Sequence, residues 1–69
     1  MSNDLFLKEI GRKVKAARKA NRLSLPKMSV ATGIVVSNLW FLENGQRNMH
    51  ILTLKSIADV LKMDVKEFL

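Results

Sequence analysis

The chain has 69 residues, which suffice for one domain with a modest core, and its 48% hydrophobic and 26% charged residues are typical of a folded protein. No apolar run approaches the roughly 20 residues that span a bilayer, residues 1–7 lack the pattern of a signal peptide, and the absence of cysteine excludes disulfides and thiolate metal sites. A formal net charge of +6 favours a polyanionic partner such as nucleic acid, although it also fits a solvated basic surface. We therefore expect one domain over residues 1–69 of a cytoplasmic protein.

The first predicted helix covers about residues 4–20, where apolar side chains recur at spacings of three and four residues. The members of this stripe are Leu7, Ile10, Val14 and Ala17. Basic residues occupy the remaining surface, which we expect to be solvated. Asn21 follows the helix, and asparagine tolerates the left-handed conformation in which helices often end.

A second, shorter helix is predicted over about residues 25–32. Ser24 is a good N-cap, because its hydroxyl can accept a hydrogen bond from the backbone of the first turn. Met28 and Ala31 are expected to face inward. Gly33 ends the helix, since glycine adopts the left-handed conformation without strain.

Two further helices and a final turn complete the predicted fold. They cover about residues 35–44, closed by Gly45, and about residues 51–61. Asp64 and Glu67 then have the spacing of a capping box, which opens the last turn. The pattern predicts an all-α domain of five helices without a sheet. The side chains expected to be buried together are Val14, Met28, Leu39, Leu42, Leu54 and Ile57.

Residues 24–44 have the form of a helix-turn-helix: a short helix, a glycine turn and a second helix. Several stretches around this unit match one family of DNA-binding domains in order and spacing. They are Ile10-Gly11-Arg12, Ala17-Arg18, Leu23-Ser24, Thr32-Gly33-Ile34, Leu39, Leu42-Glu43-Asn44-Gly45 and Thr53-Leu54-Lys55-Ser56-Ile57-Ala58. Through them, residues 10–69 resemble the phage-repressor and Cro-like helix-turn-helix family, often called XRE.

The resemblance implies a compact, five-helix, lambda-repressor-like fold and a transcriptional regulator that binds operator DNA, usually as a dimer. It also implies a structural ion pair between Arg18 in the first helix and Glu43 at the end of the third. Neither an enzyme nor a cofactor is expected. His50 is the only histidine in a chain without cysteine, so no Cys/His metal site is available, and nothing in the pattern places a carboxylate near it.

The predicted recognition helix, residues 35–44, departs from the family pattern. Val35 and Val36 stand where the family usually has polar residues, and Trp40 and Phe41 occupy two further positions that are usually polar. A helix that is apolar all round normally has a second surface to bury against.

A helical wheel separates the two sides of this helix. At about 100° per residue, Val35, Leu39 and Leu42 share one face, which we expect to join the core. Ser37 and Phe41 point in nearly the opposite direction, with Trp40 beside them. The face expected to meet DNA therefore carries two aromatic side chains.

Three interpretations of these aromatics stay open. In the first, the outer face of the helix reads bases in the major groove, where apolar side chains can contact thymine methyl groups. Base contacts would then come from Val36, Ser37, Asn38 and Phe41. In the second, Trp40 and Phe41 form a protein-binding patch, so that the domain is an interaction module on the same fold. In the third, they pack on neighbouring helices.

Phosphate contacts are expected mainly from the loop after the recognition helix. Arg47 is the strongest candidate, since a guanidinium pairs well with phosphate. The full set of expected phosphate contacts is Lys27, Trp40, Asn44, Gln46, Arg47 and Asn48. We also expect a homodimer on DNA that associates only weakly in solution, with Phe68 and Leu69 at the contact.

Overall fold

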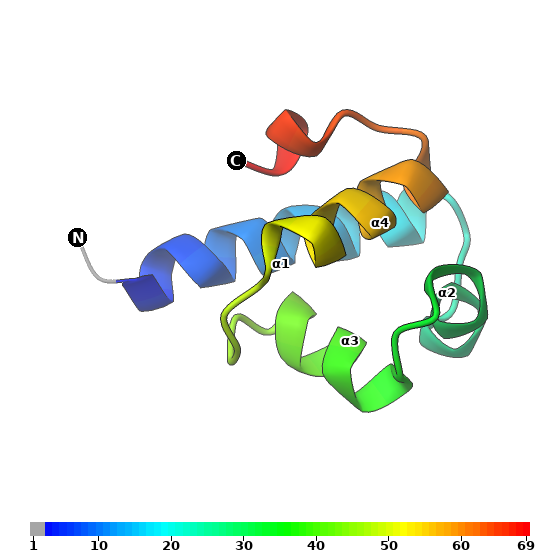
Figure 1. Cartoon of the computed structure of the whole chain (residues 1–69), viewed down its shortest axis with the longest axis horizontal. Helices are drawn as coiled ribbons and strands as arrows, with labels where there is room; N and C mark the ends of the chain where they lie inside the picture. The colour runs from blue at the N-terminus through cyan, green and yellow to red at the C-terminus, as the bar shows by residue number, and fades with distance from the viewer. Residues whose placement is uncertain (1–2) are drawn as a thin grey trace.

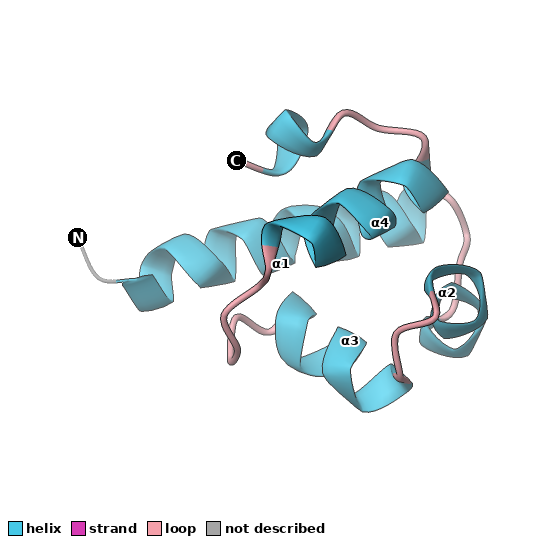
Figure 2. Cartoon of the chain, in the orientation of Figure 1, coloured by secondary structure: helices cyan, strands magenta, loops and turns pink. Residues whose placement is uncertain are grey.

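The computed structural model describes residues 3–69, which form helices joined by short loops (Figure 1). In chain order the elements are α1 (Asn3–Ala20), α2 (Leu25–Thr32), α3 (Val36–Glu43), α4 (Ile51–Leu61) and the 3₁₀ helix η1 (Val65–Phe68). Within residues 3–69 there is no strand (Figure 2), so the predicted all-α class is confirmed. The fifth element differs from expectation, because this last turn is a 3₁₀ helix rather than an α-helix.

The long α1 forms an axis against which α3, α4 and η1 pack. In Figure 1, α4 crosses in front of α1, η1 lies above both, and α3 lies below them at the edge of the molecule. The main partner of α1 is α3, and α2 packs against α3 and α4. This arrangement buries one side of α3 and leaves its other side at the molecular surface.

The hydrophobic core collects side chains from every element. All six residues predicted to be buried together are at most 6% exposed, which confirms the predicted core. The core also contains Phe68 of η1, which is 1% exposed. Phe68 is therefore not available as a dimer contact, contrary to expectation, whereas Leu69 beside it is 55% exposed.

Two side chains that we expected in the core are exposed. Val35 is 58% exposed because it is the N-cap of α3 and has extended backbone angles, so it lies outside the helical face of Leu39. Its neighbour Ile34 packs against the core instead. Ala31 is exposed because it lies about 60° from Met28 around α2, on the side away from Leu25 and Thr32, which are partly buried neighbours of Met28 on this helix.

The ends of the first two helices follow local capping rules, with one difference. The left-handed residue after α1 is Arg22, with φ 56°, rather than Asn21, whose side-chain amide donates to the carbonyl of Ala17 at 2.8 Å. The hydroxyl of Ser24 accepts from the backbone N–H of Lys27 at 3.2 Å, as its N-cap assignment predicts. Gly33 adopts φ 77° and its N–H donates to Ser29.

Gly11 allows α1 to approach the end of α3 closely. A Cβ atom at this position would lie 2.5 Å from the carbonyl oxygens of both Leu42 and Glu43. These are backbone atoms and cannot rotate away. The absence of a side chain at Gly11 therefore sets how deeply α3 sits against α1.

Among residues 3–69, no single helix is long and apolar enough to cross a membrane. The pair α2 and α3 passes that test only when the two are taken together, across a bend of 109°. The same part of the chain holds no cluster of three or more His, Asp or Glu side chains that could bind a metal ion.

Candidate nucleic-acid interface

The segment from Ser24 to Glu43 forms a helix-turn-helix. The turn consists of Gly33 in the left-handed conformation and two residues that lead into α3. The bend between α2 and α3 is 109°, within the range of about 90–120° that this motif adopts. The left-handed glycine makes this sharp change of direction possible in so short a connection.

A buried ion pair fixes the far end of α3 to α1. The Nε atom of Arg18 donates to Oε2 of Glu43 at 2.6 Å, and its Nη2 donates to Oε1 at 3.1 Å. Arg18 also donates through Nη1 to the carbonyl of Leu23, at 2.7 Å. The ion pair implied by the resemblance is thus present, and no buried side-chain nitrogen or oxygen within residues 3–69 lacks a partner.

The outer side of α3 presents the residues expected to read bases. Val36 is 40% exposed and Ser37 is exposed, whereas Asn38 and Phe41 are half-buried. Trp40 is 46% exposed, so the interpretation in which both aromatics pack on neighbouring helices is wrong for this residue. The reason is that Leu39 and Leu42 already fill the contact between α3 and the core.

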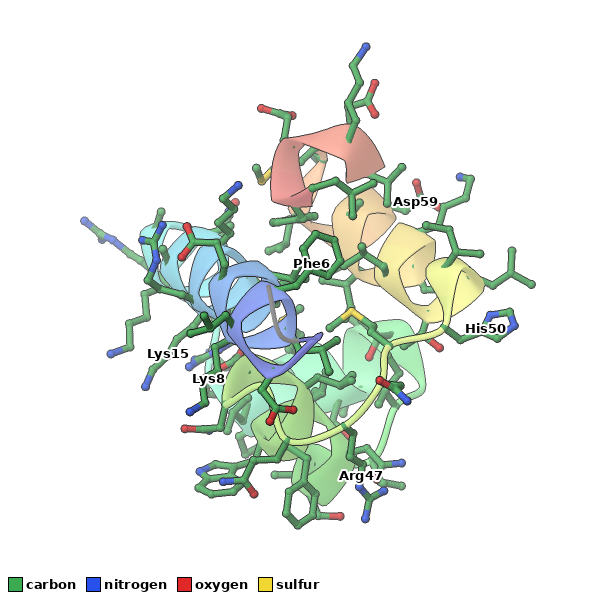
Figure 3. All side chains as sticks on the ribbon, turned by 90° about the vertical axis from the view of Figure 1, so that its left-hand side faces the viewer. Phe6, Lys8, Lys15, Arg47, His50 and Asp59 are labelled. Carbon is green, nitrogen blue, oxygen red and sulfur yellow. The ribbon has the colours of Figure 1, made fainter. Side chains whose placement is uncertain are left out.

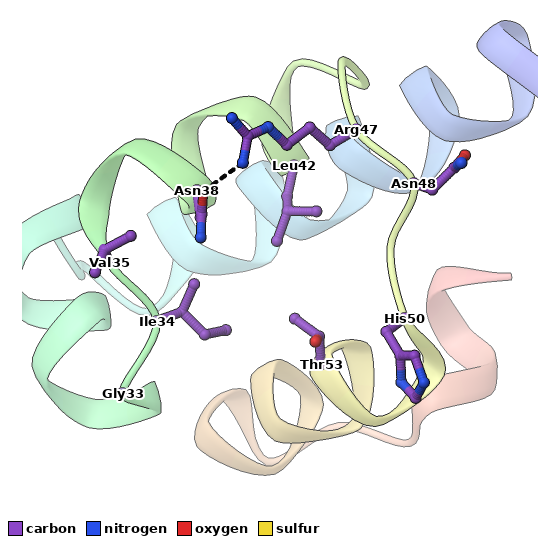
Figure 4. A pocket seen from close by; sticks show the side chains of 9 residues that line it. All are labelled: Gly33, Ile34, Val35, Asn38, Leu42, Arg47, Asn48, His50 and Thr53. Carbon is purple, nitrogen blue, oxygen red and sulfur yellow. Dashed lines mark hydrogen bonds between the residues drawn. The ribbon is translucent and has the colours of Figure 1, made fainter.

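Arg47 is held against α3 rather than free in solvent. Its Nη1 donates to Oδ1 of Asn38 at 2.7 Å, as the dashed line in Figure 4 shows. Its Cζ atom lies 4.5 Å from the centroid of the Phe41 ring, a cation–π contact. The rings of Trp40 and Phe41 in turn meet in a T-shaped contact, with centroids 5.4 Å apart and planes at 83°. These contacts join an expected phosphate-binding residue to two expected base-reading residues.

The rest of the loop after α3 combines exposed polar side chains with one that caps the helix. The Nδ2 atom of Asn44 donates to the carbonyl of Trp40 at 2.8 Å, so this amide group is engaged at the helix end. Gln46 and Asn48 are exposed. Lys27 is also exposed but lies in the first turn of α2, apart from the loop.

A groove that the sequence did not reveal runs between α3 and the beginning of α4. It has a volume of about 420 Å³, and Figure 4 shows Asn38 and Arg47 on one side with His50 and Thr53 on the other. The imidazole of His50 caps α4, since its Nδ1 accepts from the N–H of Leu52 at 3.2 Å. The position of His50 just before a predicted helix was the only sequence signal for this arrangement.

Basic side chains predominate on this side of the molecule, where one acidic residue, the exposed Asp4 of α1, lines a hollow with Gln46, Arg47 and Asn48. Between residues 10 and 58 the only acidic residue is Glu43, which is buried against Arg18. Within residues 3–69, neither Lys27 nor Arg47 forms an ion pair with a carboxylate. Figure 3 shows Arg47 at one end of the molecule and Asp59 toward the opposite end.

Other acidic groups are neutralised away from the helix-turn-helix. On α1, Glu9 pairs with Arg12, and this hydrogen bond holds the pKa of the Glu9 carboxyl below its usual range. On α4, Asp59 pairs with Lys55 at 3.2 Å. Of the exposed carboxylates, Asp4 at the beginning of α1 lies beside the loop after α3, whereas none lies on α3 itself.

The fold and this surface define a helix-turn-helix domain. The chain is similar to an HTH_3 family transcriptional regulator from Vibrio cholerae, with 30% sequence identity and a TM-score of 0.89 over 97% of this chain. This chain spans 38% of the length of that regulator. It is also similar to the restriction-modification controller protein C.AhdI from Aeromonas hydrophila, with 23% identity, a TM-score of 0.94 and full coverage of both chains. No protein-family model and no curated protein matches the chain.

These structural neighbours confirm the resemblance to phage-repressor and Cro-like helix-turn-helix proteins. One neighbour is named a transcriptional regulator and the other a restriction-modification controller protein. The identity to the controller protein is low, so that likeness concerns the fold.

Proposed function

We propose that the chain is a sequence-specific regulator that binds duplex DNA with α3 in the major groove. The observation that carries this proposal is that residues 10–58, which include α2, α3 and the loop after α3, contribute exposed basic side chains such as Lys27 and Arg47 and no exposed carboxylate. A phosphate backbone attracts such a surface and would be repelled by carboxylates. Both structural neighbours are regulators, which supports the same conclusion. A cytoplasmic location is part of this proposal, because the chain would act where duplex DNA is found.

In this mode of binding, side chains on the outer side of α3 contact bases, and residues around α3 contact the phosphate backbone of the DNA. The base-reading residues are Val36, Ser37, Asn38 and Phe41. The backbone contacts are Lys27, Trp40, Asn44, Gln46, Arg47 and Asn48. The indole N–H of Trp40 is a donor suited to phosphate, and the amide groups of the loop are suited to phosphate and sugar oxygens.

A homodimer on DNA is part of the proposal. With Phe68 buried, several exposed apolar side chains remain for a contact at the beginnings of α1 and α4 and at the end of the chain, besides Val30 of α2. They are Leu5, Phe6, Ile51, Leu52 and Leu69. Two domains joined in this way would place two copies of α3 on half-sites about one helical turn apart.

A second candidate function is supported by one observation, the exposure of Trp40. An exposed tryptophan beside a second aromatic ring is a common anchor for protein partners. In this alternative the domain is an interaction module, and the Trp40–Phe41 surface binds another protein. The two functions use overlapping residues, so binding experiments are needed to separate them.

Selection from a pool of random duplex DNA tests the proposal. We expect the chain to enrich one sequence, and its affinity for that sequence to fall steeply as salt rises, because phosphate binding releases counterions. A chain that enriches no sequence and shows no salt-dependent binding is not a DNA-binding regulator. The variant Phe41→Ala then separates the two candidates: under the DNA model it weakens base preference and leaves non-specific binding unchanged, whereas under the interaction model it affects only a protein complex.

A further inference from the structure

We infer that Arg47 determines the base preference of the recognition helix. By binding the carbonyl oxygen of Asn38, Arg47 leaves only the N–H donors of that amide to contact DNA, and these donors select guanine at the base pair that Asn38 faces. This inference rests on the proposed binding of α3 to duplex DNA. It assigns Arg47 a positioning role in addition to any contact with phosphate.

The hydrogen bond between the two residues determines which way the Asn38 amide points. Arginine has only donors, so the atom of Asn38 that lies 2.7 Å from Nη1 of Arg47 is the carbonyl oxygen. The amide nitrogen, with its two N–H groups, is the part of Asn38 left for another partner. The polarity of this side chain is thus set within the protein, before any ligand binds.

The position of Arg47 is itself fixed from a second side. Its guanidinium lies over the ring of Phe41, 4.5 Å from the centroid, and Trp40 packs against that ring in a T-shaped contact. Phe41 and Asn38 are three residues apart on α3, so they lie on the same side of the helix. Arg47 therefore bridges neighbouring side chains of one helical surface and does not need DNA to order it.

The result is a cluster that offers hydrogen-bond donors only. The free donors are the N–H groups of the Asn38 amide and the N–H groups of Arg47 that do not bind Asn38. The positive charge of Arg47 also disfavours a second donor at the Asn38 oxygen. In the major groove, guanine presents two acceptors, N7 and O6, whereas adenine presents one acceptor and one donor, thymine presents one acceptor beside its methyl group, and cytosine presents a donor. A donor-only cluster fits guanine best.

Removal of Arg47 reverses this preference. Without the guanidinium, the Asn38 amide presents both an acceptor and a donor, the combination that pairs in a bidentate manner with adenine N6 and N7. The variant Arg47→Ala should therefore do more than weaken binding. It should change which base is favoured at one position of the site.

Affinities for four duplexes that differ at a single base pair test this inference. The base pair is the one whose preference disappears in Asn38→Ala, and the duplex is otherwise the sequence selected by the wild-type chain. We expect the wild type to favour guanine over adenine by about tenfold, which is within the usual discrimination of a base contact. We expect Arg47→Ala to favour adenine. The control Lys27→Ala, which removes a charge from α2, should weaken all four complexes and keep the guanine preference.

Each outcome has a defined meaning. If the wild type favours adenine, cytosine or thymine at this base pair, or if Arg47→Ala keeps the wild-type preference, the inference is wrong while DNA binding stands. If the wild type binds no duplex, the proposed function fails and the inference fails with it. Circular dichroism of each variant verifies the fold; Asn38 and Arg47 lie outside the core, so neither substitution should unfold the domain.

Discussion

Arg18 of α1 and Glu43, the last residue of α3, form a doubly hydrogen-bonded ion pair 25 positions apart in the chain. Their side chains are 10% and 3% exposed. The pair ties the end of the recognition helix to the scaffold helix, and Gly11 on α1 contacts the same helix end. The orientation of α3 is thus determined by contacts that lie away from its outer face.

Loss of one partner of this pair should be strongly destabilising. Glu43→Ala leaves the Arg18 guanidinium buried without its carboxylate, which should lower the free energy of unfolding by about 3–5 kcal/mol. Urea unfolding followed by circular dichroism measures this change. The control is Asp59→Ala, which removes the pair between Lys55 and Asp59, both more than 60% exposed, and should cost less than about 1 kcal/mol. Equal effects of the two substitutions would contradict the structural role of the buried pair.

Substitution of Gly11 should be destabilising for reasons of space. Gly11→Ala places a methyl group 2.5 Å from two carbonyl oxygens of α3, so the helices must separate, at a cost of about 1–3 kcal/mol. Gly33 is the matched control, because it has φ 77° and open space around it. Asparagine tolerates a left-handed conformation, so Gly33→Asn should be milder than Gly33→Ala, whereas Gly11→Asn should be at least as harmful as Gly11→Ala. Thermal unfolding of the four variants reveals whether this order holds.

The salt dependence of DNA binding should report the loss of each phosphate contact. Arg47→Ala and Lys27→Ala should each lower the slope of log affinity against log salt by about one and weaken binding to unrelated duplexes. Fluorescence anisotropy at several salt concentrations measures the slope. A slope that is the same as that of the wild type would mean that the substituted residue does not contact phosphate.

The fluorescence of Trp40 should respond to DNA. Trp40 is the only tryptophan and is 46% exposed, so the free protein should emit near the maximum of a solvated indole. Addition of a selected duplex should shift this emission to shorter wavelength, because the indole loses water contacts beside the phosphate backbone. An emission spectrum that does not change when the duplex binds would place Trp40 outside the interface and favour the protein-binding alternative.

The oligomeric state should depend on DNA. The exposed apolar side chains at the beginnings of α1 and α4 and at Leu69 are scattered over three short segments, so we expect weak self-association in free solution. On DNA, selected sequences should contain two half-sites roughly 34 Å apart. Sedimentation with and without duplex measures both states. A tight dimer at low micromolar concentration without DNA, or a single half-site in the selected sequences, would contradict this prediction.

Local patterns in the sequence determined where the helices begin and end. The N-cap at Ser24, the left-handed Gly33 and the capping box of Asp64 and Glu67 are present as predicted. Each of these features depends on residues within about four positions of one another, so the chain encodes them directly. The spacing of apolar residues likewise predicted the central core, because a helix that must bury one face repeats its apolar residues at helical spacing.

Tertiary contacts decided which apolar side chains at the ends of helices are buried, which the spacing of apolar residues in the sequence did not predict. The helical wheel placed Val35 in the core, but α3 starts one residue later and Ile34 packs there instead. Phe68 was expected at a dimer contact, yet it is buried against the rest of the chain.

In the candidate site, too, the sequence predicted the elements and packing determined the contacts between side chains. The sequence identified the recognition helix and the loop that follows it, but it gave no sign that Arg47 lies over Phe41 and binds Asn38 nine positions earlier. That arrangement depends on the path of the loop from the end of α3 back along the helix. The chain by itself determined which residues occupy helix and loop, through rules that act over a few positions. Only packing between segments decided which of those side chains meet, because each such contact depends on the placement of several elements at once.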